Sequence, residues 1–344
     1  MKIWAKYSDE IQFCCPVWLE DRGLLISEIT FPISIILLSE FNIGSGKQVL
    51  FSIIRVSKNI IAIYQAMRQA DHIHLRCPGN IGLLGCLIQI FFPNKKKTAK
   101  YAGNWDPKSK QPWSYRLQKW LLSNTFLTRN MQVLVYGEWK DQSKNIKSFF
   151  TATYLESEKK MFSEKSLDST IHFIFVGALV PGKNPLYAVQ MAEKLFKKGY
   201  TVHLDLYGEG TERALLEQYI IESNLEEVIE LKGNQPKDII KQAYQKSHFV
   251  MLPSKSEGWP KAVAEAMFWG CVPIATSVSC VPFMLDSGNR GVLLEMELEQ
   301  DIRQLENLLN NQTEFTAKSQ KASEWSTKYT LDGFEAEIRK ILLR

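Results

Sequence analysis

The stretch Ser256–Ala266, SEGWPKAVAEA, combines residue types that suit the binding of an anionic ligand. Pro260 is well placed for the first turn of the helix that the following pattern predicts. The first backbone N–H groups of a helix, here those of Lys261 and Ala262, have no partner inside it. Together with the helix dipole they favour an anion such as a diphosphate, and Gly258 lets that anion approach the backbone.

Two carboxylates flank this predicted helix entrance. Glu257 lies in the loop before the helix and Glu265 lies two turns into it, so both can face one ligand at different depths. Carboxylate oxygens accept hydrogen bonds from sugar hydroxyls. Because a glutamate pair with this spacing is also common on solvent-facing helices, its meaning depends on the surrounding sequence.

Two further junctions between a strand and a helix precede this stretch, and both contain glycine. The first, FVGALVPGKNPL, carries Gly177 and Lys183, and the second, LDLYGEGTERALL, carries Gly208 and Gly210. In an open parallel sheet, ligands bind beyond the carboxyl ends of the strands, where such junctions lie. A single glycine turn also serves simply to close a connection, so the ordered series carries the prediction.

Residues 166–300 alternate β-branched or aromatic runs with helical stretches, which predicts an α/β fold with a parallel sheet and crossover helices. Apolar residues recur at helical spacing in Asn184–Lys198 and Thr211–Ser223. The predicted strands are Ile171–Val176, Val202–Tyr207, Val228–Leu231, His248–Leu252 and Val272–Ala275. This half is therefore predicted to be a Rossmann-type domain.

The first half is predicted to form a second α/β domain, because 344 residues exceed what one core usually holds. The lysine- and tryptophan-rich segment Asn94–Gln118 predicts a surface loop leading into a helix near Tyr115–Ser123, and the polar stretch Gln142–Asp168 predicts the linker. The other predicted elements are strands at Glu10–Val17, Ile33–Leu38 and Ala70–Leu75, and helices at Val49–Met67 and Ile81–Phe92.

The ordered motifs of the second half resemble the family-4 class of retaining glycosyltransferases, among the group 1 glycosyl transferases. The resemblance runs from Phe173 to Leu294 and implies the GT-B architecture, in which two Rossmann-like domains face a cleft. It implies an acceptor-side domain over residues 1–165, a donor domain over 166–325, and a C-terminal helix over 326–344 that packs back on the first domain. Its motifs are the Gly177–Lys183 turn, YGEG, LKGNQPKDI, LPSKSEGWPKAVAEA, GCVPIAT and GNRGVLL.

The resemblance also implies roles for single residues. Glu265 would hold the ribose hydroxyls of the donor, Glu257 the hydroxyls of the transferred sugar, and Lys183 the diphosphate. An arginine commonly follows the first glycine in this class, but this chain has Ala178, so Lys255 or Lys261 is the candidate for the missing cation. The remaining donor-binding positions are Gly177, Gly208, Gly210, Asn234, Gly258, Trp259, Pro260 and Ala262.

The first half resembles the family less closely. In ADHIHLRCPGNIGLLG, which is similar to the segment before the cleft, His74 and Arg76 are candidates for contacts with the reacting groups. A histidine at a strand end also serves often as a structural residue. The usual opening strand and its glycine loop are not evident, and Gly44–Gly46 in NIGSGK, too short for a phosphate-binding Walker loop, is predicted to be a turn.

The resemblance implies transfer of a hexosyl group from a nucleotide-diphosphate sugar to a glycan or lipid-linked acceptor, in bacterial surface polysaccharide biosynthesis. No Asp-x-Asp element is placed to bind a divalent ion, so neither a metal nor another cofactor is expected. A nucleotide-sugar epimerase or phosphorylase of the same architecture is an alternative, as is a non-catalytic nucleotide-sugar-binding protein. The base, the sugar and the linkage are left open.

Charge and cysteine content suggest where the protein acts. Residues 1–165 carry 23 Lys and Arg against 13 Asp and Glu, a balance of +10, whereas the remainder carries 19 against 24, a balance of −5. The basic half suits an anionic membrane or a phosphorylated acceptor, although solvated surface lysines explain it equally, and the acidic half argues against nucleic acid. Six cysteines without a CxxC pair and an N-terminus without a signal-peptide pattern predict a cytoplasmic protein, at the inner face of the plasma membrane.

Overall fold

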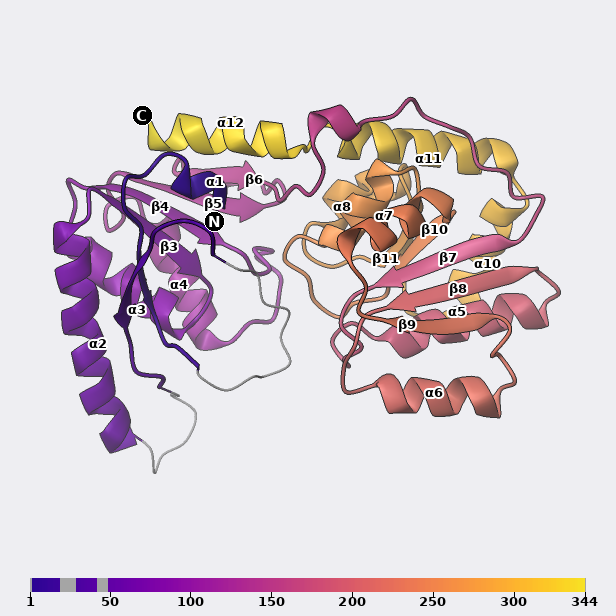
Figure 1. Cartoon of the computed structure of the whole chain (residues 1–344), viewed down its shortest axis with the longest axis horizontal. Helices are drawn as coiled ribbons and strands as arrows, with labels where there is room; N and C mark the ends of the chain where they lie inside the picture. Colours follow the sequence, from indigo (N-terminus) through magenta and orange to yellow (C-terminus); the bar gives the residue numbers. More distant parts are fainter. Residues whose placement is uncertain (1, 19–28, 42–48, 344) are drawn as a thin grey trace. The chain divides into compact units, whose positions relative to one another are not determined.

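The computed structural model describes residues 2–18, 29–41 and 49–343. The chain divides into two compact units: unit 1 comprises Met1–Phe149 and Glu335–Arg344, and unit 2 comprises Phe150–Phe334 (Figure 1). The chain therefore enters unit 2 earlier than residue 166, where the sequence placed the boundary. The turn predicted at Gly44–Gly46 lies outside the described residues.

Unit 2 is built on a parallel sheet of six strands in the order β12-β11-β10-β7-β8-β9. All five predicted strands are confirmed, β7 and β8 to the residue, and the short strand β12 was not predicted. The order reverses between β7 and β10, because β8 and β9 follow β7 on one side whereas β11 and β12 follow β10 on the other (Figure 1). The strands are β7 Ile171–Val176, β8 Val202–Tyr207, β9 Ile229–Gly233, β10 Phe249–Leu252, β11 Val272–Thr276 and β12 Val292–Leu294.

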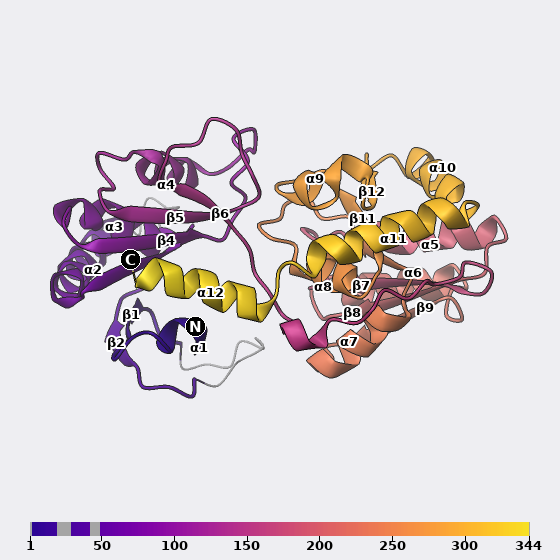
Figure 2. The ribbon, with the colours of Figure 1, turned by 90° about the horizontal axis from the view of Figure 1, so that it is seen from above.

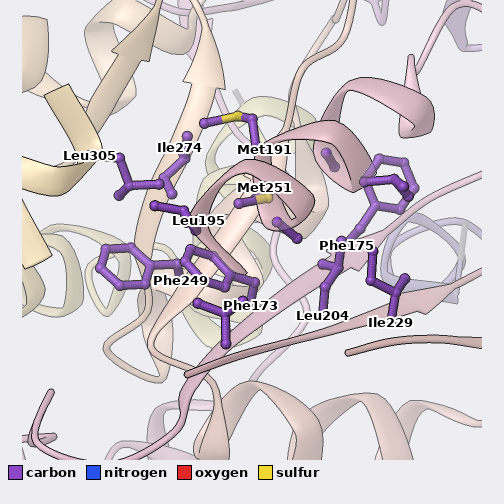
Figure 3. Close-up of a cluster of buried hydrophobic side chains, with 14 of the residues drawn as sticks. Phe173, Phe175, Met191, Leu195, Leu204, Ile229, Phe249, Met251, Ile274 and Leu305 are labelled. Atoms are coloured by element: carbon purple, nitrogen blue, oxygen red, sulfur yellow. The ribbon is translucent and has the colours of Figure 1, made fainter. Parts of the chain in front are cut away.

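Helices cover this sheet on both faces because its central strands β7 and β10 carry buried apolar residues on both sides. Phe173 belongs to a large buried cluster with residues of α5, α6 and α10, part of which Figure 3 shows, whereas Ile174 packs with residues of α7 and α8. Helix α11 packs against α8 (Figure 2). The helices of this unit are η3 Glu156–Glu158, α5 Pro185–Lys197, α6 Arg213–Glu222, α7 Lys237–Lys246, α8 Lys261–Phe268, α9 Val281–Met284, η4 Asp286–Gly288, α10 Leu298–Leu309 and α11 Gln312–Ser326.

Unit 1 contains, among its described residues, a parallel sheet in the order β3-β4-β5-β6 and a separate parallel pair, β1 with β2. The six elements predicted for this half by range are confirmed with shifts of a few residues at their ends. The last helix, α12 Leu331–Leu342, starts in unit 2 and ends in unit 1. The other elements are α1 Lys2–Ala5, β1 Gln12–Cys15, β2 Ser34–Leu37, α2 Val49–Gln69, β3 His72–Cys77, α3 Asn80–Ile88, η2 Gln89–Phe91, β4 Lys96–Tyr101, α4 Trp113–Ser123, β5 Met131–Tyr136 and β6 Ile146–Phe149.

The surface loop predicted for residues 94–118 was wrong over its first part, where β4 lies inside the sheet between β3 and β5. The prediction failed because a lysine-rich segment is usually exposed to solvent. Lys97 is buried and its ammonium donates to the carbonyl oxygens of Gln89 and Phe92, at 3.2 and 2.9 Å. The buried Lys100 lies over the ring of Tyr136, with Nζ 5.3 Å from the centroid. Charged side chains can thus occupy a central strand when carbonyls and aromatic faces receive their ammonium groups.

The predicted linker, residues 142–168, also contains an edge strand, β6. Three of its four residues are at least partly exposed, so the hydrophobic pattern that marks a buried strand is missing. Over the described parts of both units, no helix has the length and apolar content needed to cross a membrane.

Candidate functional site

The loops that follow β7 and β10 meet through an ion pair at the point where the strand order reverses. Lys183 Nζ, from the first loop, lies 2.5 Å from Glu257 Oε1, from the second. The Glu257 side chain is only 6% exposed, whereas that of Lys183 is 31% exposed. A carboxylate so far removed from water requires a partner, and Lys183 supplies it. The two residues predicted from separate motifs are therefore brought together.

Backbone contacts fix the two loops around this ion pair. The N–H of Lys255 donates to the carbonyl oxygen of Gly182 at 2.9 Å, which joins the loops directly. The carbonyl oxygen of Gly258 accepts from Ser279 Oγ at 3.2 Å. Ser254 Oγ is fully buried and has no hydrogen-bond partner among the described residues. Buried hydroxyls are nearly always satisfied, so the unpaired Ser254 hydroxyl is unusual for a buried group.

Helix α8 begins at Lys261, directly after this loop, and Pro260 occupies the N-cap position, one residue before the first turn in which the sequence placed it. No side chain caps the helix, so its first N–H groups are available to an anion. Glu265 lies one turn further along, and its Oε1 is 3.2 Å from Lys261 Nζ. Both predicted carboxylates thus stand beside a lysine, and the site balances its own charges in this structure.

The glycines Gly208 and Gly210 allow the loops after β7 and β8 to interlock. A Cβ atom on Gly208 would lie 1.9 Å from the carbonyl oxygen of Gly177, and one on Gly210 would lie 2.2 Å from that of Leu179. The N–H of Gly177 also donates to the carbonyl oxygen of Tyr207 at 3.0 Å. These glycines therefore position the loop that carries Lys183, while their contact with a donor stays a prediction.

Three other residues predicted to contact the donor are Asn234, Trp259 and Lys255. They lie at or near the same loops, and their contacts with a donor stay predictions. Asn234 is exposed directly after β9, and Ala178 is exposed where the resemblance leads one to expect an arginine. Trp259 is buried, and its ring stacks on Trp325 with centroids 6.0 Å apart, so packing explains its presence. The ammonium group of Lys255 is on an exposed residue, where it is free to turn toward an anion.

His74 and Arg76 lie on β3 in unit 1. His74 Nδ1 is 2.8 Å from Thr98 Oγ1, and the ring packs on Trp4 with centroids 4.3 Å apart. Burial, reinforced by the positive charge of Arg76, lowers the pKa of His74 to about 3, so the ring is neutral at physiological pH. Arg76 is exposed near the carboxyl end of the strand. Their contact with substrates stays a prediction, and the surroundings of His74 are those of a packed residue.

A group of potential metal ligands lies elsewhere, on the bodies of β8 and β9. Ligand atoms of His203, Asp205 and Glu230 lie within 4.8 Å of one another. Lys232 is paired with Glu230, and its Nζ is 3.6 Å from Asp205 Oδ1. One ammonium group therefore already pairs with both carboxylates. The absence of a metal requirement stays a prediction.

Sequence reasoning missed two residues that contact Glu265. Thr153 Oγ1 donates to Glu265 Oε1 at 2.6 Å, and the hydroxyl of Tyr244 lies 3.4 Å from Glu265 Oε2. Thr153 comes from the segment predicted to be a linker and Tyr244 from α7, so both contacts arise only from the folded arrangement. The sequence holds no local signal for either.

Unit 2 is similar in sequence to known glycosyltransferases. Residues 156–326 match the family described as Glycosyl transferases group 1. The matched residues all lie in unit 2. The chain is also 27% identical over 169 residues to "Uncharacterized glycosyltransferase MJ1178" of Methanocaldococcus jannaschii, a match that covers 49% of this chain and 46% of that protein. A protein of Salmonella typhimurium named "Putative colanic acid biosynthesis glycosyltransferase WcaL" is 28% identical over 138 residues, 38% of this chain and 34% of its own length.

The matched part of the chain thus spans less than half the length of each of these two relatives. Among solved structures, HepE of Anabaena in complex with UDP and glucose is similar with a TM-score of 0.67 and 13% identity, over 91% of this chain and 86% of that one. This likeness concerns the fold. The chain has the α/β fold of the GT-B glycosyltransferases, as the sequence predicted.

The Lys183–Glu257 ion pair predicts a measurable coupling in stability. We expect Lys183→Met and Glu257→Gln to show a coupling of about 1–2 kcal/mol in the free energy of unfolding, because each single change leaves the other group unpaired. Denaturant unfolding of the wild type, both single variants and the double variant measures it. The exposed pair Lys194 with Glu299 serves as control and should show a much smaller coupling. Additive effects at Lys183 and Glu257 would contradict the assignment.

Proposed function

We propose that the protein is a retaining glycosyltransferase that binds a nucleotide-diphosphate sugar at the carboxyl edge of the unit 2 sheet. The observation that carries this proposal is the Lys183–Glu257 ion pair across the reversal of strand order, beside the uncapped start of α8. Ligands of open α/β sheets bind at such a reversal. The group 1 family match and the complex of HepE with UDP and glucose support a sugar nucleotide as ligand.

In the proposed complex, the diphosphate lies at the start of α8, where the free N–H groups and Lys183 stabilise the charge that develops as it leaves. Glu257 is then free to accept hydrogen bonds from the transferred sugar, and Glu265 accepts them from the ribose. The departing phosphate takes the proton of the acceptor hydroxyl on the same face of the sugar. No protein nucleophile and no metal ion are required in this scheme, and the anomeric configuration is retained.

The acceptor in this proposal is a glycan or lipid-linked intermediate of a bacterial surface polysaccharide, and the transferred group is a hexosyl group. The colanic acid assignment in the name of the Salmonella relative supports this class of product. We place the reaction in the cytoplasm, where sugar nucleotides are made and where six free cysteines are compatible with a reducing environment.

Nucleotide binding tests the proposed donor site. At saturating concentration, one of UDP, GDP or ADP should raise the melting temperature by several degrees, since a ligand at 100 times its Kd stabilises the native state by about 2.7 kcal/mol. We expect Glu265→Ala to abolish the rise and Glu299→Gln, which removes an exposed carboxylate elsewhere in unit 2, to preserve it. An equal rise in the Glu265→Ala variant would contradict the ribose contact, and isomerisation of the donor alone would indicate an epimerase.

We also propose that unit 1 binds an anionic membrane surface through α2, α3 and α4. Residues 49–130 contain 13 Lys and Arg but only 2 Asp and Glu. Adjacent helices of this series contact each other, α2 with α3 and α3 with α4. Large apolar side chains beside exposed arginines suit the interface of an anionic bilayer. The exposed apolar residues are Ile54, Ile61, Tyr64, Leu87, Phe91, Trp113, Trp120 and Phe126, and the exposed cations are Arg55, Lys58, Arg68, Arg116 and Arg129.

Vesicle flotation tests the membrane proposal. The protein should float with phosphatidylglycerol vesicles at low salt, should float less at high salt, and should not float with neutral phosphatidylcholine. Replacing Trp113 and Trp120 by Ser should reduce the bound fraction several-fold, whereas Phe196→Ser, at an exposed aromatic of unit 2, should leave it unchanged. Absence of binding to anionic vesicles at low salt would overturn this part of the proposal.

A further inference from the structure

Three side chains contact the carboxylate of Glu265, and they differ in how firmly they are held. Oε1 accepts from Thr153 Oγ1 at 2.6 Å and lies 3.2 Å from Lys261 Nζ, whereas Oε2 is 3.4 Å from the hydroxyl of Tyr244. The Glu265 side chain is 14% exposed, and that of Lys261 is 47% exposed. Tyr244 is fully buried. Tyr244 therefore contacts Glu265 from the interior, whereas the Lys261 ammonium is carried on an exposed side chain.

We propose that Thr153 and Tyr244 are positioning residues that orient Glu265 for the two ribose hydroxyls of the donor, and that Lys261 is the group the ribose displaces. This inference rests on the proposed function, because it assigns partners to the carboxylate that is to hold the ribose. It adds two residues that no motif in the chain indicates.

The number of hydrogen bonds that Glu265 can accept supports the idea that Thr153 and Tyr244 remain in place while Lys261 is displaced. An ionised carboxylate has about two acceptor directions on each oxygen. Thr153 takes one on Oε1 and Tyr244 takes one on Oε2, so the departure of Lys261 leaves one direction on each oxygen. A vicinal diol, such as the 2′ and 3′ hydroxyls of a ribose, offers two donors that fit this pattern.

Once displaced from Glu265, the Lys261 ammonium can pair with another group in the same site. Lys261 is the first residue of α8, at the end of the helix where the diphosphate is proposed to bind. The loop after β7 has Ala178 in place of the cation expected from the resemblance. Exchange of Lys261 from Glu265 to the diphosphate would supply a second positive charge beside Lys183. One nucleotide would thus satisfy both members of the Lys261–Glu265 pair.

The backbone around Thr153 is held on unit 2, which allows its hydroxyl to act as a fixed donor. The N–H of Leu331 donates to the carbonyl oxygen of Tyr154 at 2.8 Å. The ring of Tyr154 packs on Phe268 and Trp269, with centroids 4.9 and 5.2 Å away. Burial and the nearby Glu265 carboxylate raise the pKa of Tyr244 well above its usual value, so this hydroxyl also stays protonated and can donate.

A comparison of ribonucleotides with their 2′,3′-dideoxy analogues tests the inference, because it isolates the ribose hydroxyls. Calorimetric titration with UDP, GDP and ADP first identifies the nucleotide that the wild type binds. We expect the wild type to bind its dideoxy analogue at least tenfold more weakly, since hydrogen bonds to a charged group are involved. In the Thr153→Val variant, the ratio of the affinities for the ribonucleotide and its dideoxy analogue should fall roughly tenfold. The Tyr244→Phe variant should show a smaller fall in the same ratio.

Two controls separate positioning from structure. Thr153→Ser keeps the hydroxyl and should restore the preference for the ribonucleotide, and Thr201→Val, at an exposed threonine of unit 2, should leave it unchanged. In turnover assays, Thr153→Val should raise KM for the donor with little change in kcat, because the ribose contact is made equally in ground and transition states. A purely structural role would lower the melting temperature without changing the ratio of the two affinities.

The outcomes distinguish this inference from the proposed function. A wild-type protein that binds none of the three nucleotides would overturn the donor site itself and the inference with it. A wild-type protein that binds and prefers the ribonucleotide, together with a Thr153→Val variant that retains the full preference, would overturn the inference alone and leave the donor site standing.

Discussion

The ion pair between Lys183 and Glu257 is the interaction on which the rest of the site depends. It joins the loops after β7 and β10, neighbouring strands whose connections leave the sheet in opposite directions. Because the crossover helices diverge there, the sheet has an edge where no connection passes over the strand ends. The strand order therefore leaves the ends of β7 and β10 uncovered, and the Lys183–Glu257 ion pair lies there.

Charge balance explains why such a site is stable and still able to bind. Glu257 pairs with Lys183, and Glu265 with Lys261, so neither carboxylate is left unpaired within the protein. A sugar nucleotide carries negative phosphates and neutral hydroxyl donors, which are the complements of these lysines and glutamates. Binding can therefore exchange internal partners for ligand partners without leaving a buried charge unsatisfied. A ligand that lacked either the phosphates or the hydroxyls could satisfy only half of the site.

Five strands of unit 2 could be predicted from the sequence because they are short runs rich in β-branched and aromatic residues, and glycine directly follows β7 and β8. Gly208 and Gly210 marked the strand ends correctly, and the structure adds the reason, which is the close approach of the loop carrying Lys183. β4 could not be predicted, because its lysines are satisfied by the carbonyl oxygens of Gln89 and Phe92 and by rings on β5 and β6, contacts that exist only in the folded chain. Thr153 could not be identified as a site residue for a similar reason, since its partner Glu265 lies more than a hundred residues away in the sequence.

The central claim is that a nucleotide-diphosphate sugar replaces the internal partners of Lys183 and Glu257. The most direct measurement is a crystal structure of the protein with the nucleotide that binds and a non-hydrolysable sugar derivative of it. The account predicts a diphosphate at the start of α8 within hydrogen-bond distance of Lys183 Nζ, and Glu257 turned to the sugar hydroxyls. A bound nucleotide elsewhere, or one that leaves the Lys183–Glu257 ion pair intact, would contradict it.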